Sequence, residues 1–168
     1  DGWDPVTVNR GSDKRFIWKC SLSHKWKASV GDRTSGKGCP ACSNRTVVVG
    51  FNDLATTNPE LAAEADGWDA TTVVGKSGKK MKWKCKIGHS WSASIDNRAK
   101  GTGCPVCSNR TVVVGFNDLR TTNPELAAQA DGWDSAEVVA YSNKKVNWMC
   151  SRNHRWSAVI SSRSGGNG

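Results

Sequence analysis

The sequence repeats itself with a period of 65 residues. Shifting the chain by this period superposes the same residue types without a gap, namely Trp3, Trp68 and Trp133, then Cys20, Cys85 and Cys150, then His24, His89 and His154. A fixed period of this length is typical of a chain that uses one supersecondary unit several times. The 168 residues therefore predict a string of small modules and not one large domain.

The period divides the chain into modules and connectors. We expect a first module at residues 1–50, a helical connector at 51–67, a second module at 68–115, a second helical connector at 116–132, and a partial third module at 133–168. The chain begins inside a motif that recurs later and stops before a third Cys-Pro-x-Cys motif would follow. Both ends are therefore expected to be cuts through a longer array.

The cysteines favour metal binding over disulfides. A unit of about 65 residues lies near the lower limit for a fold held by its hydrophobic core alone, so an additional cross-link is expected. The chain has seven cysteines, distributed as three, three and one over the repeats. An odd number in this distribution fits a disulfide framework poorly and a metal framework well. We therefore expect reduced cysteines and an intracellular protein.

Each of the first two repeats carries four candidate metal ligands at identical spacing. A Cys-x3-His pair is followed after fourteen residues by a Cys-x2-Cys pair. Four such ligands suit tetrahedral Zn2+, and a closed shell of four protein ligands indicates a structural ion and not a catalytic one. The predicted sites are Cys20, His24, Cys39 and Cys42 in the first module and Cys85, His89, Cys104 and Cys107 in the second.

Two alternatives stay open for these sites. Cysteines can be small buried hydrophobic residues and histidines can be satisfied core residues, although exact recurrence of all four types argues against this reading. Each histidine could also lie beside the ion without binding it. The third repeat has only Cys150 and His154. This partial site should bind zinc weakly unless another chain completes it.

The repeat resembles a known family. The pattern W-x-C-x3-H-x-W-x-A, a later arginine, G-x-G-C-P-x-C, "NDLATTNPELA" and "GWD" together look like the treble-clef, or probable zinc-ribbon, repeat of bacterial, phage and some eukaryotic proteins. The resemblance covers nearly the whole chain. It implies a Cys-His-Cys-Cys zinc site in each complete repeat and suggests a nucleic-acid context, because such repeats often lie beside nuclease-like domains.

Local patterns predict small α+β modules in which zinc-binding β-hairpins are joined by short helical connectors. In the second repeat, "KKMKWKC" and "SWSASI" alternate with a period of two, which predicts a hairpin. A glycine-bearing loop should then lead to the Cys-Pro-Val-Cys turn, and "TVVV" should form a short third strand. Asn58 and Pro59 mark a helix start, so we expect helices over 59–65 and 124–130.

The nine tryptophans allow two interpretations. Trp18 and Trp26, like their equivalents in the later repeats, lie two residues from a predicted ligand and on the same strand face as that ligand. Packing around the metal is favoured over base stacking of the kind seen in proteins that bind single strands. Trp3, Trp68 and Trp133 are expected to pin each connector to the module that follows.

Positive charge is concentrated in the modules. The formal net charge is +9, yet residues 51–75 carry no basic and five acidic side chains, whereas residues 76–110 carry nine basic and one acidic. A charge run is often only a solvated face, but a stripe that recurs in each repeat is what phosphate contact requires. The candidate nucleic-acid-binding residues are Lys14, Arg15, Arg33, Arg45, Lys79, Lys80, Arg98, Arg110, Lys144, Lys145 and Arg163.

These features predict a non-catalytic array that binds nucleic acid, in particular duplex DNA, with two structural Zn2+ ions. No histidine is left over as a general base, and the acidic residues lie mainly in the connectors, so we expect no enzyme activity. Arg33 and Arg98 are the predicted groove contacts. The alternatives are a structural or protein-interaction scaffold with an acidic partner, or the targeting part of a larger nuclease-like protein. No apolar run is long enough to predict a membrane partner.

Overall fold

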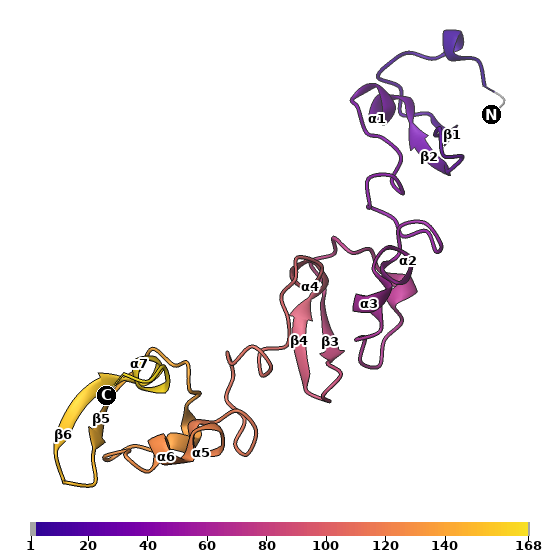
Figure 1. Cartoon of the computed structure of the whole chain (residues 1–168). Coiled ribbons are helices and arrows are strands. Elements are labelled where there is room, and N and C mark those ends of the chain that lie inside the picture. Colours follow the sequence, from indigo (N-terminus) through magenta and orange to yellow (C-terminus); the bar gives the residue numbers. More distant parts are fainter. Residues whose placement is uncertain (1–2, 168) are drawn as a thin grey trace. The chain divides into compact units, whose positions relative to one another are not determined.

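The computed structural model describes residues 3–167, so the outermost residues of the first and last predicted modules lie outside it (Figure 1). Its three sheets are two-stranded antiparallel hairpins, one in each repeat. They pair β1 (Arg15–Lys19) with β2 (Lys25–Ser29), β3 (Lys80–Lys84) with β4 (Ser90–Ser94), and β5 (Lys145–Met149) with β6 (Arg155–Val159). The alternation in the sequence therefore identified the hairpins correctly.

Each hairpin runs directly into a one-turn helix where a loop was expected. These helices are α1 (Val30–Thr34), α4 (Ile95–Ala99) and α7 (Ile160–Ser164). The Ser29 hydroxyl caps α1 by accepting a hydrogen bond from the Asp32 N–H at 3.1 Å. An acidic residue in the first turn adds to this stabilisation. The capping serine at the end of a strand was the signal that the sequence interpretation overlooked.

The connectors contain two short helices each, and the predicted single helices were too long. The first connector forms α2 (Leu54–Thr57) and α3 (Pro59–Ala62), and the second forms α5 (Leu119–Thr122) and α6 (Pro124–Ala127). The helix expected over 59–65 ends at Ala62 because the chain beyond it pairs with the hairpin: the Lys84 N–H donates to the Glu64 carbonyl at 2.8 Å. The helix expected over 124–130 ends at Ala127 in the same way, since the Met149 N–H donates to the Gln129 carbonyl.

Asp53 begins α2 as its N-cap. Its carboxylate accepts hydrogen bonds from the hydroxyl and the backbone N–H of Thr56 and from the Gly50 N–H. The Thr56 hydroxyl, together with these backbone donors, holds the pKa of the Asp53 carboxyl below its usual range. Asp118 plays the same part in the second connector, where it caps α5.

The predicted third strand is absent at both "TVVV" segments of the described chain. In its place, residues 46–53 form a loop around the buried Asn52 side chain. The amide of Asn52 donates to the carbonyls of Ala41 and Thr46 at 2.9 and 3.0 Å, and its oxygen accepts from the Val48 N–H at 2.7 Å. In a β-strand, these backbone groups would form hydrogen bonds with a neighbouring strand. Here the Asn52 side chain forms hydrogen bonds with them instead.

The chain divides into two compact units. One consists of the residues up to Lys84 together with Ser92–Thr102, and the other of Cys85–Trp91 together with the chain from Gly103 onward. In the second unit, α5, α6 and the third hairpin enclose a hydrophobic core built around Leu119, Trp148 and Ile160, none of which is solvent-exposed. Leu54, Trp83 and Ile95 are the equivalent buried residues of the first unit.

Each connector is thus part of the body of the repeat that follows it. An isolated β-bridge joins Ala65 to Trp83, and the Trp68 indole packs edge to face on Trp83 with ring centroids 5.0 Å apart. Trp133 and Trp148 repeat this contact at 5.1 Å, which confirms the predicted pinning role of the "GWD" tryptophans.

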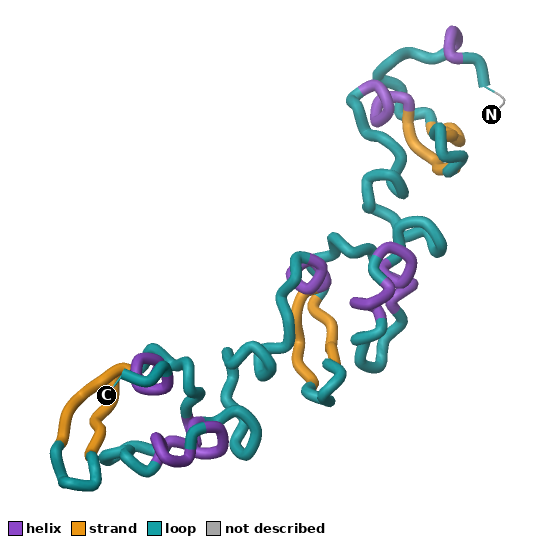
Figure 2. Tube along the Cα trace, in the orientation of Figure 1, coloured by secondary structure: helices purple, strands orange, loops and turns teal. Residues whose placement is uncertain are grey.

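Short helices and strands separated by long loops make up the rest of the chain (Figure 2). No helix of residues 3–167 has the length and apolar character that crossing a membrane requires.

Candidate metal centre

Four side chains of the first repeat converge at the tip of its hairpin. Cys20 and His24 lie at the two ends of the turn between β1 and β2, where the Cys20 N–H donates to the His24 carbonyl at 3.1 Å. Cys39 and Cys42 come from the Cys-Pro-Ala-Cys turn. The His24 Nδ1 atom lies 3.5, 3.8 and 3.4 Å from the sulfurs of Cys20, Cys39 and Cys42, and the Cys20 and Cys42 sulfurs are 3.8 Å apart.

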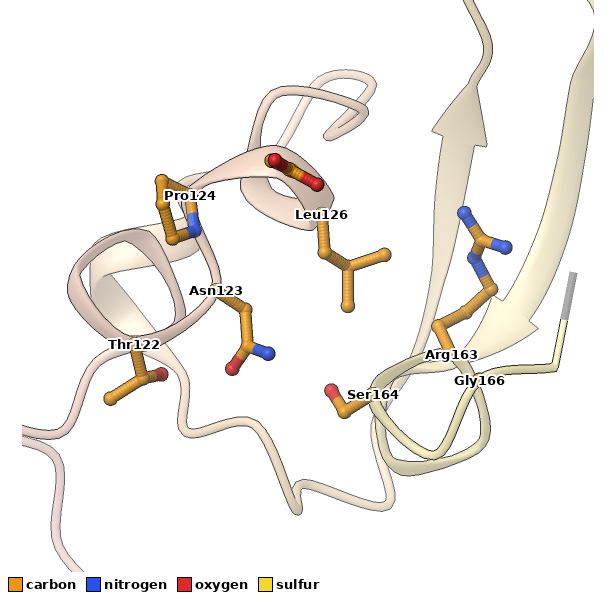
Figure 3. A pocket seen from close by; sticks show the side chains of 8 residues that line it. Thr122, Asn123, Pro124, Leu126, Arg163, Ser164 and Gly166 are labelled. Atoms are coloured by element: carbon orange, nitrogen blue, oxygen red, sulfur yellow. The ribbon is translucent and has the colours of Figure 1, made fainter.

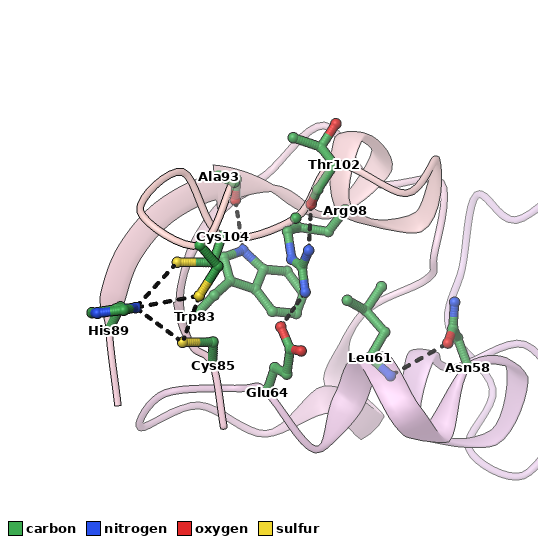
Figure 4. A network of polar contacts seen from close by, with 12 residues as sticks. Asn58, Leu61, Glu64, Trp83, Cys85, His89, Ala93, Arg98, Thr102 and Cys104 are labelled. Carbon is green, nitrogen blue, oxygen red and sulfur yellow. Dashed lines mark hydrogen bonds and ion pairs between the residues drawn. The ribbon is translucent and has the colours of Figure 1, made fainter. Parts of the chain in front are cut away.

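The second repeat reproduces this cluster almost atom for atom. The His89 Nδ1 atom lies 3.5, 3.7 and 3.4 Å from the sulfurs of Cys85, Cys104 and Cys107. Figure 4 shows the Cys85 and Cys104 sulfurs turned toward the same ring nitrogen. In each cluster all four ligand atoms lie within 4.8 Å of one another. The two ligand sets expected from spacing alone are therefore assembled in space.

These distances fit a tetrahedral zinc ion. With Zn–S of about 2.3 Å and Zn–N of about 2.0 Å, a tetrahedron places sulfur about 3.5 Å from nitrogen and sulfurs about 3.8 Å apart. The observed sulfur–nitrogen distances of 3.4–3.8 Å and sulfur–sulfur distances of 3.8–3.9 Å lie close to these values. Four protein ligands close such a shell, so the cluster can cross-link the hairpin tip to the Cys-Pro turn without an open position for a reacting water.

The thiols also have the electrostatics of a cation site. Desolvation acts to raise the pKa of Cys20, but hydrogen bonds from the backbone N–H groups of His24 and Leu22 and from neighbouring thiols lower it to about 7. Desolvation and the nearby sulfurs of Cys39 and Cys20 raise the pKa of Cys42 to about 11. Sulfurs packed this closely cannot all ionise unless a cation lies among them.

The turn that carries the second cysteine pair is braced by an arginine. Arg45 Nε donates to the Ser43 hydroxyl at 2.9 Å, and its Nη2 donates to the Gly38 carbonyl at 3.0 Å. Arg110 makes the same two bonds to Ser108 and Gly103. These two predicted nucleic-acid contacts are solvent-exposed, yet their guanidinium groups also hold the metal-binding turn in shape.

The third repeat presents only half of such a centre. Cys150 and His154 occupy the ends of the turn between β5 and β6, with the Cys150 N–H donating to the His154 carbonyl at 3.0 Å. Within residues 3–167, the two candidate metal clusters are those of the first and second repeats. Cys150 and His154 are not joined there by further cysteine or histidine ligands.

The structure places Arg98 inside the fold. Its side chain is 7% exposed and forms an ion pair with Glu64 of the connector. Its guanidinium also donates to the Thr102 carbonyl and lies over the Trp83 ring, 5.1 Å from the centroid (Figure 4). A buried side chain that is held by an ion pair, a backbone hydrogen bond and a ring contact cannot also enter a DNA groove without breaking them.

The equivalent arginines share this arrangement. Arg33 lies over Trp18 and Trp26 at 5.1 and 5.2 Å, and its Nη1 donates to the Lys37 carbonyl. Arg163 lies over the two tryptophans of the third hairpin and donates to Gln129 at 2.5 Å. The arginine between two rings is a packing site that sequence reasoning missed. The spacing of the arginine from both tryptophans recurs in every repeat and could have identified it.

The remaining predicted basic residues lie on the surface. Three pairs mark the entrance to the hairpins, and all six residues are solvent-exposed: Lys14 and Arg15, Lys79 and Lys80, and Lys144 and Lys145.

A cavity of about 380 Å3 lies between α6 and α7 (Figure 3). Its lining includes Asn123, Leu126, Arg163 and Ser164, with Glu125 as its carboxylate. A single carboxylate beside an arginine that is already engaged by Gln129 supplies neither a nucleophile with its base nor a pair of acids.

Comparison with known proteins agrees with this geometry. The chain matches the family described as "Probable Treble clef zinc finger domain" over residues 2–45, 60–110 and 127–168, one match for each repeat. It is also 25% identical over 103 residues to a protein of Escherichia phage T5 described as "Putative endonuclease". That alignment covers 61% of this chain and 35% of the phage protein, so the chain corresponds to about a third of its relative.

Proposed function

We propose that this chain, which belongs to the treble-clef zinc finger family, is a non-catalytic array that binds duplex DNA through its hairpins. Zinc is the ion that this family implies, and the Cys-His-Cys-Cys clusters fit it in both donor type and ligand spacing. Cys20, His24, Cys39 and Cys42 would hold one ion and their second-repeat equivalents the other. The bound ion would cross-link each hairpin tip to its Cys-Pro turn.

The observation that carries the proposal is the charge of the hairpins. Residues 14–31 and 79–95 carry five basic side chains each, residues 144–160 carry four, and none of the three segments contains an acidic residue. On the first hairpin, Lys19 and Lys25 lie directly opposite each other in the strand register. The two side chains concentrate positive charge on this face of the hairpin, which would attract phosphate groups.

The proposed contact residues are only partly those that the sequence suggested. We assign phosphate contact to the exposed residues at the hairpin entrances and to Lys19, Lys25 and Lys82 on the outer strand faces. Arg33, Arg98 and Arg163 instead support the hairpins from within, because their guanidinium groups are engaged by tryptophan rings and by connector or backbone oxygens.

A second candidate function is the targeting part of a larger nuclease-like protein. It is favoured by the similarity to a phage protein described as "Putative endonuclease", of which this chain covers 35%. In that case the array would bring DNA to a catalytic domain that lies in the other part of the relative. Both candidates predict DNA binding by the array, and they differ only in what is attached to it.

The test is a titration of labelled duplex DNA with the zinc-loaded chain at several salt concentrations. Affinity should fall steeply as salt rises, because bound lysines release counterions from the phosphates. The variant K79Q/K80Q should bind more weakly, and the slope of log affinity against log salt should fall by about 2, one unit for each lost phosphate contact.

A matched control separates local contact from net charge. The variant A63E/A128E changes the net charge by the same two units at exposed connector positions. It should retain most of the affinity and slope of the unmodified chain. Equal losses of DNA affinity in both variants would mean that only the net charge matters. If the unmodified chain does not bind DNA, the proposal is overturned and the alternative of an acidic protein partner is favoured.

A further inference from the structure

Beside each complete metal cluster lies a group of exposed apolar side chains. In the first repeat these are Leu22 in the hairpin turn, 58% exposed, with Val49 and Phe51 of the following loop, 69% and 38% exposed. In the second repeat the same positions hold Ile87, Val114 and Phe116, at 64%, 71% and 40%. We call each group an apolar tip. Single exposed apolar side chains are common on proteins, but a group of three that recurs at matching positions beside both clusters favours a binding surface.

The rings of the tips are held in place. Phe51 packs against the ring of His24 with centroids 4.3 Å apart, and Phe116 packs against His89 at 4.6 Å. Leu22 is two residues from His24 in a closed turn, where the Ser23 N–H donates to the Cys20 carbonyl. The tip is therefore anchored to the metal cluster itself, and binding would not need to order it first.

The loop that carries each phenylalanine is equally constrained. The Phe51 N–H donates to the Val48 carbonyl at 3.1 Å, and the Gly50 N–H donates to the Asp53 carboxylate at 2.7 Å. Gly50 adopts a φ of 78°, a conformation that suits glycine and allows the tight turn in front of the ring. Gly115 repeats this at 81° in the second loop. A flexible loop would let these rings fold back onto the protein, and these bonds prevent it.

Basic residues flank the tips in the sequence. Lys19, Lys25 and Arg45 lie near the first tip along the chain, and Lys86 and Arg110 lie near the second. All five side chains are solvent-exposed. Exposed apolar side chains flanked by basic residues are complementary to a polyanion that also exposes an apolar surface. In DNA that surface is a base exposed at an unstacked step, where Phe, Leu and Ile side chains are known to act as wedges.

We propose that each apolar tip inserts at an unstacked base step while the surrounding basic residues hold the flanking phosphates. This inference rests on the proposed DNA binding and adds the type of DNA that the array prefers, namely duplexes that are kinked, mismatched or otherwise opened. Leu22 and Ile87 are the wedges, and Phe51 and Phe116 offer rings against which the displaced base stacks.

The third repeat provides an internal contrast. Arg152 stands at the position of Leu22 and Ile87, so the third hairpin has no wedge. It also shows that a polar residue is compatible with this turn, because the turn from Cys150 to His154 keeps the same backbone hydrogen bond as its two counterparts. Replacing the wedges with a polar residue should therefore leave the hairpins folded.

The experiment compares a perfect duplex with a duplex of the same length that contains a two-base mismatch. The full zinc-loaded chain should bind the mismatched duplex about tenfold more tightly, because the step is already unstacked. In the variant L22S/I87S this preference should fall to about twofold or less while the salt dependence remains. A 2-aminopurine base placed at a stacked step of the perfect duplex should brighten when the unmodified chain binds and should not brighten with the variant.

The control V6S/Y141S removes two other exposed apolar side chains and should behave like the unmodified chain. Zinc content and circular dichroism must match in all three proteins. Binding without a preference for the mismatch, or with a preference that survives L22S/I87S, overturns the inference and leaves the proposed function standing. Absence of binding to any DNA overturns both. Self-association that is lost in L22S/I87S would make the tips an interface between copies and would also overturn the inference.

Discussion

At the scale of single residues, the guanidinium of Arg98 joins three parts of one repeat. It reaches Glu64 of the connector, the Thr102 carbonyl beyond α4, and the ring of Trp83 in the hairpin. Burial removes water as an alternative partner for the charge, so each of these contacts is needed to offset desolvation. A residue that looks like a surface cation in the sequence is therefore a structural cross-link.

Arg98→Met should destabilise the first unit by about 2 kcal/mol, because the Glu64 carboxylate and the Thr102 carbonyl lose a charged donor. The measurement is urea denaturation of the zinc-loaded chain, followed by tryptophan fluorescence. Arg163→Met is the matched comparison. Its partner is the neutral Gln129, so a smaller loss of about 1 kcal/mol is expected. Equal effects of the two substitutions would contradict an ion-pair contribution.

At the scale of elements, the loop over residues 46–53 depends on one buried amide. Asn52 bonds the Ala41 carbonyl of the Cys-Pro turn as well as Thr46 and Val48 of its own loop. The metal-binding turn and the loop that carries Phe51 are consequently one structure. Asn117 makes the equivalent bonds to Val106, Thr111 and Val113 in the second repeat.

Asn52→Ala should therefore weaken metal binding at the first cluster although Asn52 touches no ligand atom. Loss of the buried amide leaves the Thr46 carbonyl without its donor and the Val48 N–H without its acceptor. This costs about 2 kcal/mol or more and should lower zinc affinity at that cluster by more than tenfold. Competition with a chromophoric chelator measures this, with the untouched second cluster as the internal reference. Asn117→Ala should move the effect to the second cluster, and an equal loss at both clusters in either variant would refute local coupling.

At the scale of the whole molecule, the hydrophobic core and the candidate metal clusters are separate parts of the fold. The body around Trp148 has a buried core and lies in the repeat that lacks a complete ligand set. By contrast, residues 85–91 and 103–111, which hold the second ligand set, contribute only Cys104 and Val106 to the buried apolar side chains. These segments should depend on the ion, since structural zinc supplies much of the folding free energy of small modules.

Removal of zinc by a strong chelator should unfold the segments that carry the metal ligands before it unfolds the hydrophobic core. Hydrogen exchange measured by mass spectrometry should show lost protection over residues 85–91 and 103–111 and retained protection over 119–127 and 145–149. Adding zinc back should restore protection of the ligand-carrying segments. The variant C42S/C107S should resemble the chelated chain without any chelator. Simultaneous loss of protection in the ligand-carrying segments and in the core would show that the metal site and the core unfold as a single cooperative unit.

The sequence by itself determined the repeat, the three hairpins and the two ligand sets. Each depends on spacing along the chain: a period of 65, an alternation of two, and Cys-x3-His with Cys-x2-Cys. Short-range geometry follows from such spacing because covalent connectivity allows few alternatives. The resemblance to treble-clef repeats rests on the same spacings, and it was confirmed by a family match to each of the three repeats.

Only the tertiary structure decided which charges face solvent. Arg98 and Lys80 look alike in the sequence, yet one pairs with Glu64, 34 residues away, and the other is exposed. The helix expected to reach Ala65 stops at Ala62 because the chain beyond it forms backbone hydrogen bonds with β3. The "TVVV" segment forms no strand because the Asn52 side chain makes hydrogen bonds to its backbone. Contacts between distant residues set these outcomes, and no local pattern contains them.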